Sequence, residues 1–184
     1  MRAVSATLTA DERVVAAARR ADWRFLLPDP GLGRVAYVAP HDPALVAALA
    51  VVGAEVELMD DPHGPGGHDV VVLTGAGRAS VGGAAGLLAP GGRLYAETTG
   101  PAVRAWSRAL VAAGYEDVET HWLWPDPDAC REIVPLARGP LRHALGRRDP
   151  GARMRGRARA ATLLAASGAF ALVVRHAAVI GRWP

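Results

Sequence analysis

The segment from Arg34 to Asp61 has the pattern of a strand, a helix and a second strand, and this pattern most restricts what the chain can fold into. Residues 35–38 form a short apolar run, which is typical of a strand buried on both faces of a sheet. Residues 43–52 begin with proline and predict a helix, which Gly53 ends. Residues 56–59 predict the second strand. This order of elements is typical of an α/β fold with parallel strands.

The residues after this unit continue the alternation of strands and helices. We predict strands at residues 69–74, 93–97 and 115–124, and helices at residues 79–88 and 101–113. The link formed by residues 62–68 is shorter than the crossover of about a dozen residues that usually joins parallel strands. We therefore expect one element that usually follows the second strand to be absent.

Both ends of the chain have patterns of their own. Residues 9–21 predict an N-terminal helix, because they begin with Thr-Ala-Asp-Glu, which has the spacing of a capping box. Residues 129–167 predict a helical insertion in two pieces, with a break at residues 149–151, Asp-Pro-Gly. Residues 170–181 predict a closing strand.

Size and composition fit a single globular domain. The chain has 184 residues, of which 51% are hydrophobic, and this is enough for one packed core. We expect one domain over residues 1–184, with its core at residues 34–124. The longest apolar stretch, residues 161–174, is short of the ~18 apolar residues that a membrane-spanning helix needs. The lone Cys130 excludes an internal disulfide, and we expect a cytoplasmic protein.

Two features of the second half complete the pattern. Residues 88–94, Leu-Ala-Pro-Gly-Gly-Arg-Leu, precede a predicted strand, and two C-terminal strands are separated by an insertion. Together with the order of the other elements, these features resemble the class I S-adenosylmethionine-dependent methyltransferases over residues 23–184. The resemblance implies a Rossmann-like α/β fold. Its sheet would be mostly parallel, with an antiparallel C-terminal edge strand, and shortened by one element after the second strand.

The loop after the first strand departs from that family. The family has an acid at the end of this strand and then a Gly-x-Gly-x-Gly loop that binds S-adenosylmethionine. The corresponding residues here are Tyr37, Ala39, His41 and Pro43. Tyr37 removes the carboxylate, and Pro43 removes a backbone donor. Ala39 and His41 add Cβ atoms where the backbone would approach the cofactor. The resemblance therefore implies a degenerate site, with weak cofactor binding or none.

Three other positions belong to the region that binds the cofactor in the family. Asp60 or Asp61, at the end of the second strand, keeps the acid that would bind the ribose hydroxyls, although an acid at a strand end is as often a solvated turn residue. Thr74 opens a Thr-Gly-Ala-Gly loop at the carboxyl edge of the sheet, where ligands bind in open α/β folds.

His41 and Glu97 are the candidates for acid–base chemistry. Both are predicted at the carboxyl ends of central strands, and both residue types serve as general acids and bases. His63 and His68 are spaced so that a metal could in principle bind them. No cysteine or clear carboxylate has ligand spacing with them, so we predict a polar loop and no metal site.

Residues 138–159 hold eight arginines and one acid, whereas the rest of the chain holds 13 bases and 17 acids. This segment raises the hypothesis of an anion- or nucleic-acid-binding module that uses Arg147 to Arg159. Against nucleic acid stand the absence of interleaved aromatic residues, the lack of a binding motif and a net charge of only +3. A solvated helix face is the favoured interpretation.

These observations leave three functional hypotheses. The first is a pseudo-methyltransferase, repurposed in a small-molecule or specialised-metabolite pathway. It would act there as a non-methylating enzyme of the cyclase or lyase type, or as a binding subunit for another biosynthetic protein. The second is an active methyltransferase that holds S-adenosylmethionine through Asp60 or Asp61. The third is the anion- or nucleic-acid-binding module.

Overall fold

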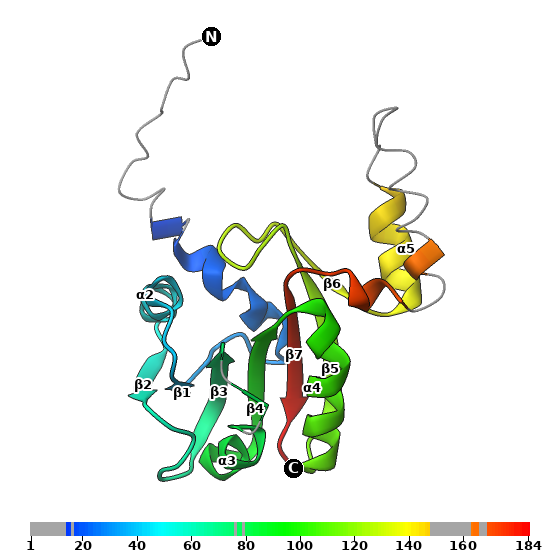
Figure 1. Ribbon diagram of the computed structural model, residues 1–184. Coiled ribbons are helices and arrows are strands. Elements are labelled where there is room, and N and C mark those ends of the chain that lie inside the picture. Colours follow the sequence, from blue (N-terminus) through cyan, green and yellow to red (C-terminus); the bar gives the residue numbers. More distant parts are fainter. Residues whose placement is uncertain (1–13, 16, 76, 79, 148–162, 166–168) are drawn as a thin grey trace.

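The computed structural model describes residues 14–15, 17–75, 77–78, 80–147, 163–165 and 169–184. Its strands are β1 (Arg34–Val38), β2 (Glu55–Met59), β3 (His68–Thr74), β4 (Leu88–Thr98), β5 (Glu116–Trp124), β6 (Glu132–Pro135) and β7 (Ala177–Arg182). Its helices are η1 (Arg19–Leu26), α2 (Pro43–Val51), α3 (Ser80–Leu87), α4 (Gly100–Ala112), α5 (Arg138–Gly146) and η3 (Phe170–Leu172), of which η1 and η3 are 3₁₀-helices (Figure 1). None of the described helices is long and apolar enough to span a bilayer.

The strands form one mixed sheet in the order β2-β1-β3-β4-β7-β5-β6. Pairing is parallel from β2 to β4, and antiparallel on both sides of β7 and between β5 and β6. This arrangement confirms the predicted fold class. The closing strand is antiparallel as expected, but its expected place at the edge is wrong. It lies between β4 and β5, where residues 177–181 are all buried, as suits their apolar and small side chains, and the antiparallel edge strand is β6.

The shortening after β2 is confirmed. Residues 60–67 connect β2 to β3 without a helix or strand, and β3 pairs in parallel with β1. No further strand pairs with the outer side of β2 in the described part of the chain, so β2 is the other edge of the sheet.

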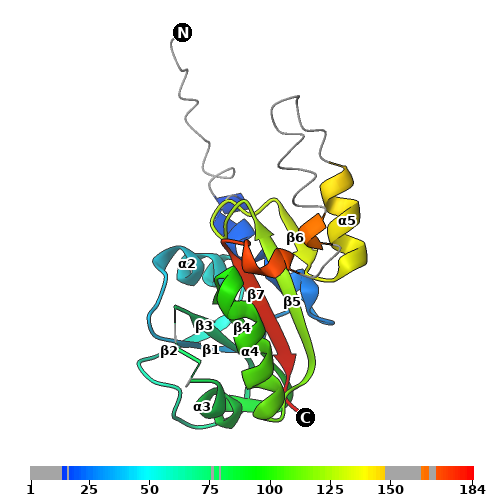
Figure 2. The same ribbon diagram turned by 45° about the vertical axis from the view of Figure 1, so that its right-hand side comes forward.

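Two apolar cores lie on the two faces of the sheet. Along β1, Val35 and Tyr37 belong to one core, and Ala36 and Val38 belong to the other, because side chains alternate along a strand. The first core is covered by η1 and α2, and the second by α3, α4 and η3. The helix α4 lies against β7 in both views (Figure 1, Figure 2).

The N-terminal helix extends further than expected. Residues 9–13 lie outside the described residues, and the helical segment that follows continues as η1 to Leu26, beyond the expected end at residue 21. The Trp23 ring in η1 is buried and stacks on the Tyr95 ring, with 3.9 Å between the ring centroids. This tertiary contact stabilises the extra turn.

The insertion contains a strand that was not predicted. Instead of continuous helix from residue 129, the chain forms β6, which pairs with β5 over residues 121–124. This pairing satisfies backbone groups that β5 would otherwise leave open at its edge. A helix does follow as α5, and the expected break at residues 149–151 lies outside the described residues.

The closing strand begins later than expected. Residues 170–172 form η3, and β7 starts at Ala177. Phe170 is buried and packs edge-on against Trp122, with 5.2 Å between the ring centroids. This contact holds the segment against β5, and the hydrogen bond from the Gly100 N–H to the Val174 carbonyl holds it against the start of α4, so β7 does not extend to these residues.

Candidate functional site

The sheet has its topological switch point between β1 and β3. The chain runs outward from β1 to β2 and then returns to β3 on the other side of β1. Ligands in open α/β folds bind outside the carboxyl ends of the strands at such a point. Tyr37 near the end of β1, Thr74 at the end of β3 and Glu97 near the end of β4 lie at this edge.

A chain of hydrogen bonds closes the switch point. The Tyr37 hydroxyl lies 2.5 Å from Thr74 Oγ1 and accepts a bond of 2.7 Å from the Asp42 N–H. The Thr74 hydroxyl donates to the Pro40 carbonyl at 3.2 Å, so Tyr37 is the donor to Thr74. Burial raises the pKa of Tyr37, and the phenol stays neutral. The polar groups at this point are therefore bonded to one another.

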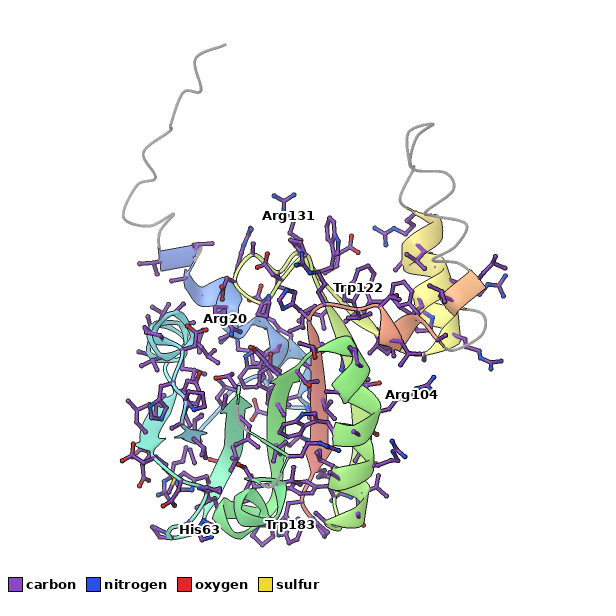
Figure 3. The ribbon with its side chains drawn as sticks, in the orientation of Figure 1. Arg20, His63, Arg104, Trp122, Arg131 and Trp183 are labelled. Atoms are coloured by element: carbon purple, nitrogen blue, oxygen red, sulfur yellow. The ribbon has the colours of Figure 1, made fainter. Side chains whose placement is uncertain are left out.

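Arg20 forms the second part of the site. Its side chain comes from η1 and is only 5% exposed, and its guanidinium contacts three carboxylates. Nη2 lies 3.0 Å from Asp42 and 2.8 Å from Glu97, and Nε lies 2.9 Å from Asp128. Figure 3 shows Arg20 between η1 and the carboxyl ends of β3 and β4. We call Arg20 and these three acids the arginine clamp.

The electrostatics of the clamp favour the charged arginine. Burial acts to lower the pKa of Arg20, but the hydrogen bond and the charge of Glu97 outweigh it, and the pKa is raised. Tyr95 donates a bond of 2.7 Å to Glu97. Burial, and then the charge of Glu97, hold the pKa of Tyr95 well above its usual range. The Glu97 carboxylate is thus bonded to both Arg20 and Tyr95.

The sequence did not reveal the arginine clamp. Arg20 lies in the predicted N-terminal helix, and no local pattern distinguishes it from the exposed Arg19 beside it. Asp42 precedes the proline that starts α2, and its side chain accepts from the Ala44 N–H at 2.9 Å as a helix cap. This capping role is the one feature of Asp42 that the sequence could have indicated, and it does not predict a buried ion pair.

His41 and Ala39 anchor the loop after β1 to β2. His41 Nε2 lies 2.9 Å from the Tyr37 carbonyl and 3.1 Å from the Met59 carbonyl. Both partners are acceptors, so Nε2 carries the proton. The Ala39 N–H donates to the same Met59 carbonyl at 2.8 Å. The structure therefore gives His41 a positioning role in the loop and joins it to Tyr37, not to Glu97.

Asp60 and Asp61 are exposed and do not join the arginine clamp. Asp61 accepts from the His63 N–H at 2.9 Å, and Figure 3 places His63 well away from Arg20. His68 is buried elsewhere, 3.0 Å from the Leu87 carbonyl and 3.0 Å from Glu57. Among the described residues, no three histidines, cysteines or acids come together as a metal site.

The lone thiol also lacks the features of a reactive group. Cys130 is half-buried, and burial raises the pKa of its thiol. A thiol with a raised pKa is a poor nucleophile, because the thiolate is the reactive form.

The residues at the switch point do not fit S-adenosylmethionine in the manner of the family. The Tyr37 side chain, and not a carboxylate, lies near the end of β1, and the Asp42 N–H is already bonded to its hydroxyl. The loops after β1 and β3 also touch, because Pro40 Cγ lies 3.1 Å from the point where a Cβ on Gly75 would stand. A cavity beside Arg20 and Tyr95 has a volume of about 10 Å³, room for about one water molecule.

Comparisons with known proteins agree with the fold. No family model and no curated protein matches the sequence. A structural match is an S-adenosylmethionine-dependent methyltransferase from Archaeoglobus fulgidus, with 9% identity and a TM-score of 0.55, covering 91% of this chain and 94% of that one. Another is a methyltransferase from Thermotoga maritima, with 11% identity and a TM-score of 0.46, covering 94% of this chain and 90% of that one. The chain has the class I methyltransferase fold.

Proposed function

We propose that this protein, which has a methyltransferase-like fold, does not transfer methyl groups. It acts instead as a binding subunit in a small-molecule or specialised-metabolite pathway. The observation that carries the proposal is the closed switch point. Tyr37 and the arginine clamp use the polar groups that a cofactor would need. The single cysteine agrees with our further proposal that the protein works in the cytoplasm.

The two candidate catalytic residues support a binding subunit over a cyclase or lyase. A general base needs a lone pair free to accept a proton, but Glu97 is held by Arg20 and Tyr95. Releasing Glu97 would leave a buried charge without its partner, which typically costs about 3–5 kcal/mol. His41 uses its Nε2–H to hold the loop, and its partners are the Tyr37 and Met59 carbonyls, not Glu97. Glu97 is therefore not free to act as a general base, and His41 is not paired with it.

The other two hypotheses have less support. An active methyltransferase would hold the ribose through Asp60 or Asp61, and the one hydrogen bond seen at these two acids is local, from the His63 N–H to Asp61 at 2.9 Å. The nucleic-acid hypothesis rests on Arg147 to Arg159, of which only Arg147 lies in the described part of the chain. The net charge of +3 adds little to it.

Calorimetric titration with S-adenosylmethionine and S-adenosylhomocysteine tests the proposal. The protein and ligand concentrations must detect dissociation constants up to about 1 mM. We expect no saturable heat and no rise in melting temperature with either compound. Saturable one-to-one binding, with methyl transfer that is lost on substituting Asp60 and Asp61, would overturn the proposal in favour of an active methyltransferase.

A further inference from the structure

A second cavity lies on the other side of the sheet, away from the switch point. It has a volume of about 490 Å³ and lies between α4, β5, η3 and the residue that follows β6. This volume is within the usual range for small-molecule sites, about 300–1,000 Å³. None of the residues of the arginine clamp lines it.

The floor of the cavity is apolar. Val103 of α4 and Ala171 of η3 belong to the core on this face, and Leu136 packs against the same core. Val103 and Ala171 are buried, so the core holds these side chains in place. A ligand on this floor would contact hydrocarbon on an already ordered surface, which lowers the entropic cost of binding.

The rim of the cavity carries positive charge and hydroxyl groups. Arg104 and Arg108 are one turn apart on α4, and both are exposed. Their spacing of four residues places them on the same side of the helix, and Arg108 Nε donates to the Arg104 backbone carbonyl at 3.3 Å. Figure 3 shows Arg104 projecting outward from α4 on the side where α5 lies. Ser107 and Thr120 add hydroxyls from two different elements.

The lining contains no carboxylate among the described residues. The guanidinium fork suits the flat, two-oxygen edge of a carboxylate or phosphate. A nucleic-acid backbone would instead need a longer series of cations, without an apolar floor.

We propose that this cavity binds a small amphipathic anion, whose carboxylate or phosphate head lies at Arg104 and Arg108. Its apolar body lies on Val103, Leu136 and Ala171, and the Ser107 and Thr120 hydroxyls donate to the head. The anion site contains no residue of the switch point. This inference therefore does not depend on the proposal that the protein has lost methyl transfer.

Four probes separate the parts of this ligand: octanoate, octyl phosphate, octanol and inorganic phosphate. Titration of the full chain by calorimetry should give saturable one-to-one binding of octanoate or octyl phosphate, and the tighter of the two identifies the head group. Octanol lacks the charge and inorganic phosphate lacks the apolar body, so each should bind at least about tenfold more weakly. No binding of either anion, or octanol binding as tightly, would overturn the proposal.

Variants locate the site. The double substitution Arg104→Gln and Arg108→Gln should weaken binding of the preferred anion by about tenfold or more, because charge-assisted hydrogen bonds are lost. Arg131→Gln removes an exposed arginine from the loop between β5 and β6 and should leave binding unchanged (Figure 3). Thr120→Val, which keeps the shape of the wall, should weaken binding less than the double substitution does. Equal affinity in the double variant and the wild type would refute the site.

Backbone amide shifts in NMR spectra distinguish this site from the switch point. The preferred anion should shift the amide signals of Ser107 and Thr120 and leave that of Tyr37 unchanged. A shift at Tyr37 without one at Ser107 would place the anion at the switch point. That result would contradict this inference and would also challenge the proposed closure of the crevice.

Discussion

Arg20 and Glu97, which are 77 residues apart in the sequence, are joined by two hydrogen bonds between guanidinium and carboxylate, one of them 2.8 Å long. Because Arg20 is only 5% exposed and Glu97 12%, this pair lies almost wholly out of water. A buried pair adds little net stability, but removing one partner leaves the other charge unpaired. The pair therefore ties η1 to the carboxyl end of β4.

Arg20→Ala should lower the free energy of unfolding by about 3–5 kcal/mol, the usual cost of breaking a buried ion pair. Urea denaturation measures this change. Arg19→Ala, at the exposed neighbour, should change it by less than about 0.5 kcal/mol. A double-mutant cycle with Glu97→Gln should show a coupling of at least about 1 kcal/mol. Additive effects of the two substitutions would mean that the pair is not formed.

Tyr37→Phe should destabilise the protein by about 1–3 kcal/mol, because the Asp42 N–H and the Thr74 hydroxyl both lose a partner. Tyr115→Phe is the matched control. That hydroxyl is also buried, but it makes one longer bond, of 3.3 Å, to the Val81 carbonyl, so its loss should cost less. Thermal or urea unfolding of both variants gives the comparison. A larger loss in the Tyr115 variant would contradict the closed switch point.

Stability should fall in acid because of His121. Its side chain is 2% exposed, and burial lowers its pKa from 6.5, against the smaller opposite effect of Glu119. The unfolded chain therefore binds this proton more readily than the folded protein does. The contribution of His121 to stability is complete above about pH 6.5 and is lost as the pH falls below that value. Urea midpoints from about pH 8 to about pH 5 should fall less in a His121→Gln variant than in the wild type. If the urea midpoints of the variant and the wild type fell by the same amount over this pH range, His121 would not be the cause of the acid destabilisation.

Two glycines should respond to alanine in opposite ways. A Cβ on Gly100 would collide with the Val174 and Ala171 carbonyl oxygens, so Gly100→Ala should cost about 1–3 kcal/mol as an overpacking change. A Cβ on Gly86, in α3, would meet nothing within 4 Å, and Gly86→Ala should stabilise the helix by about 0.5–1 kcal/mol. Thermal unfolding should give a lower melting temperature for Gly100→Ala and a higher one for Gly86→Ala than for the wild type. A neutral Gly100→Ala would mean that η3 is not held tightly against α4.

The elements predicted best are those whose local pattern and burial agree. Residues 35–38 fall within β1 and residues 43–52 match α2, because a buried apolar strand and a Pro-to-Gly helix have clear boundaries. The strand β6 was missed because its four residues have no period to recognise, and the exposed edge of β5 decides their conformation. Phe170 was placed in a strand because apolar composition alone cannot distinguish η3 from β7.

The candidate site was predicted only in part. Tyr37 and Thr74 lie side by side at one edge, because the carboxyl ends of neighbouring parallel strands meet there, while their role in binding a cofactor stays a prediction. His41 and Glu97 were considered together, but the structure gives them different partners. Strand order brings chain segments together, whereas hydrogen-bond partners depend on side-chain directions that local pattern does not specify.

The sequence by itself determined the α/β class, the shortened link after β2 and the absence of glycine at residues 39, 41 and 43, because each of these is a local property of the chain. Only the tertiary structure decided that Tyr37 closes the switch point and that Arg20 holds Glu97. Both contacts depend on where η1 and the loop after β1 cross the sheet. A buried ion pair has no local signature, since its energy comes from desolvation and from the distance between residues that only the folded chain brings together.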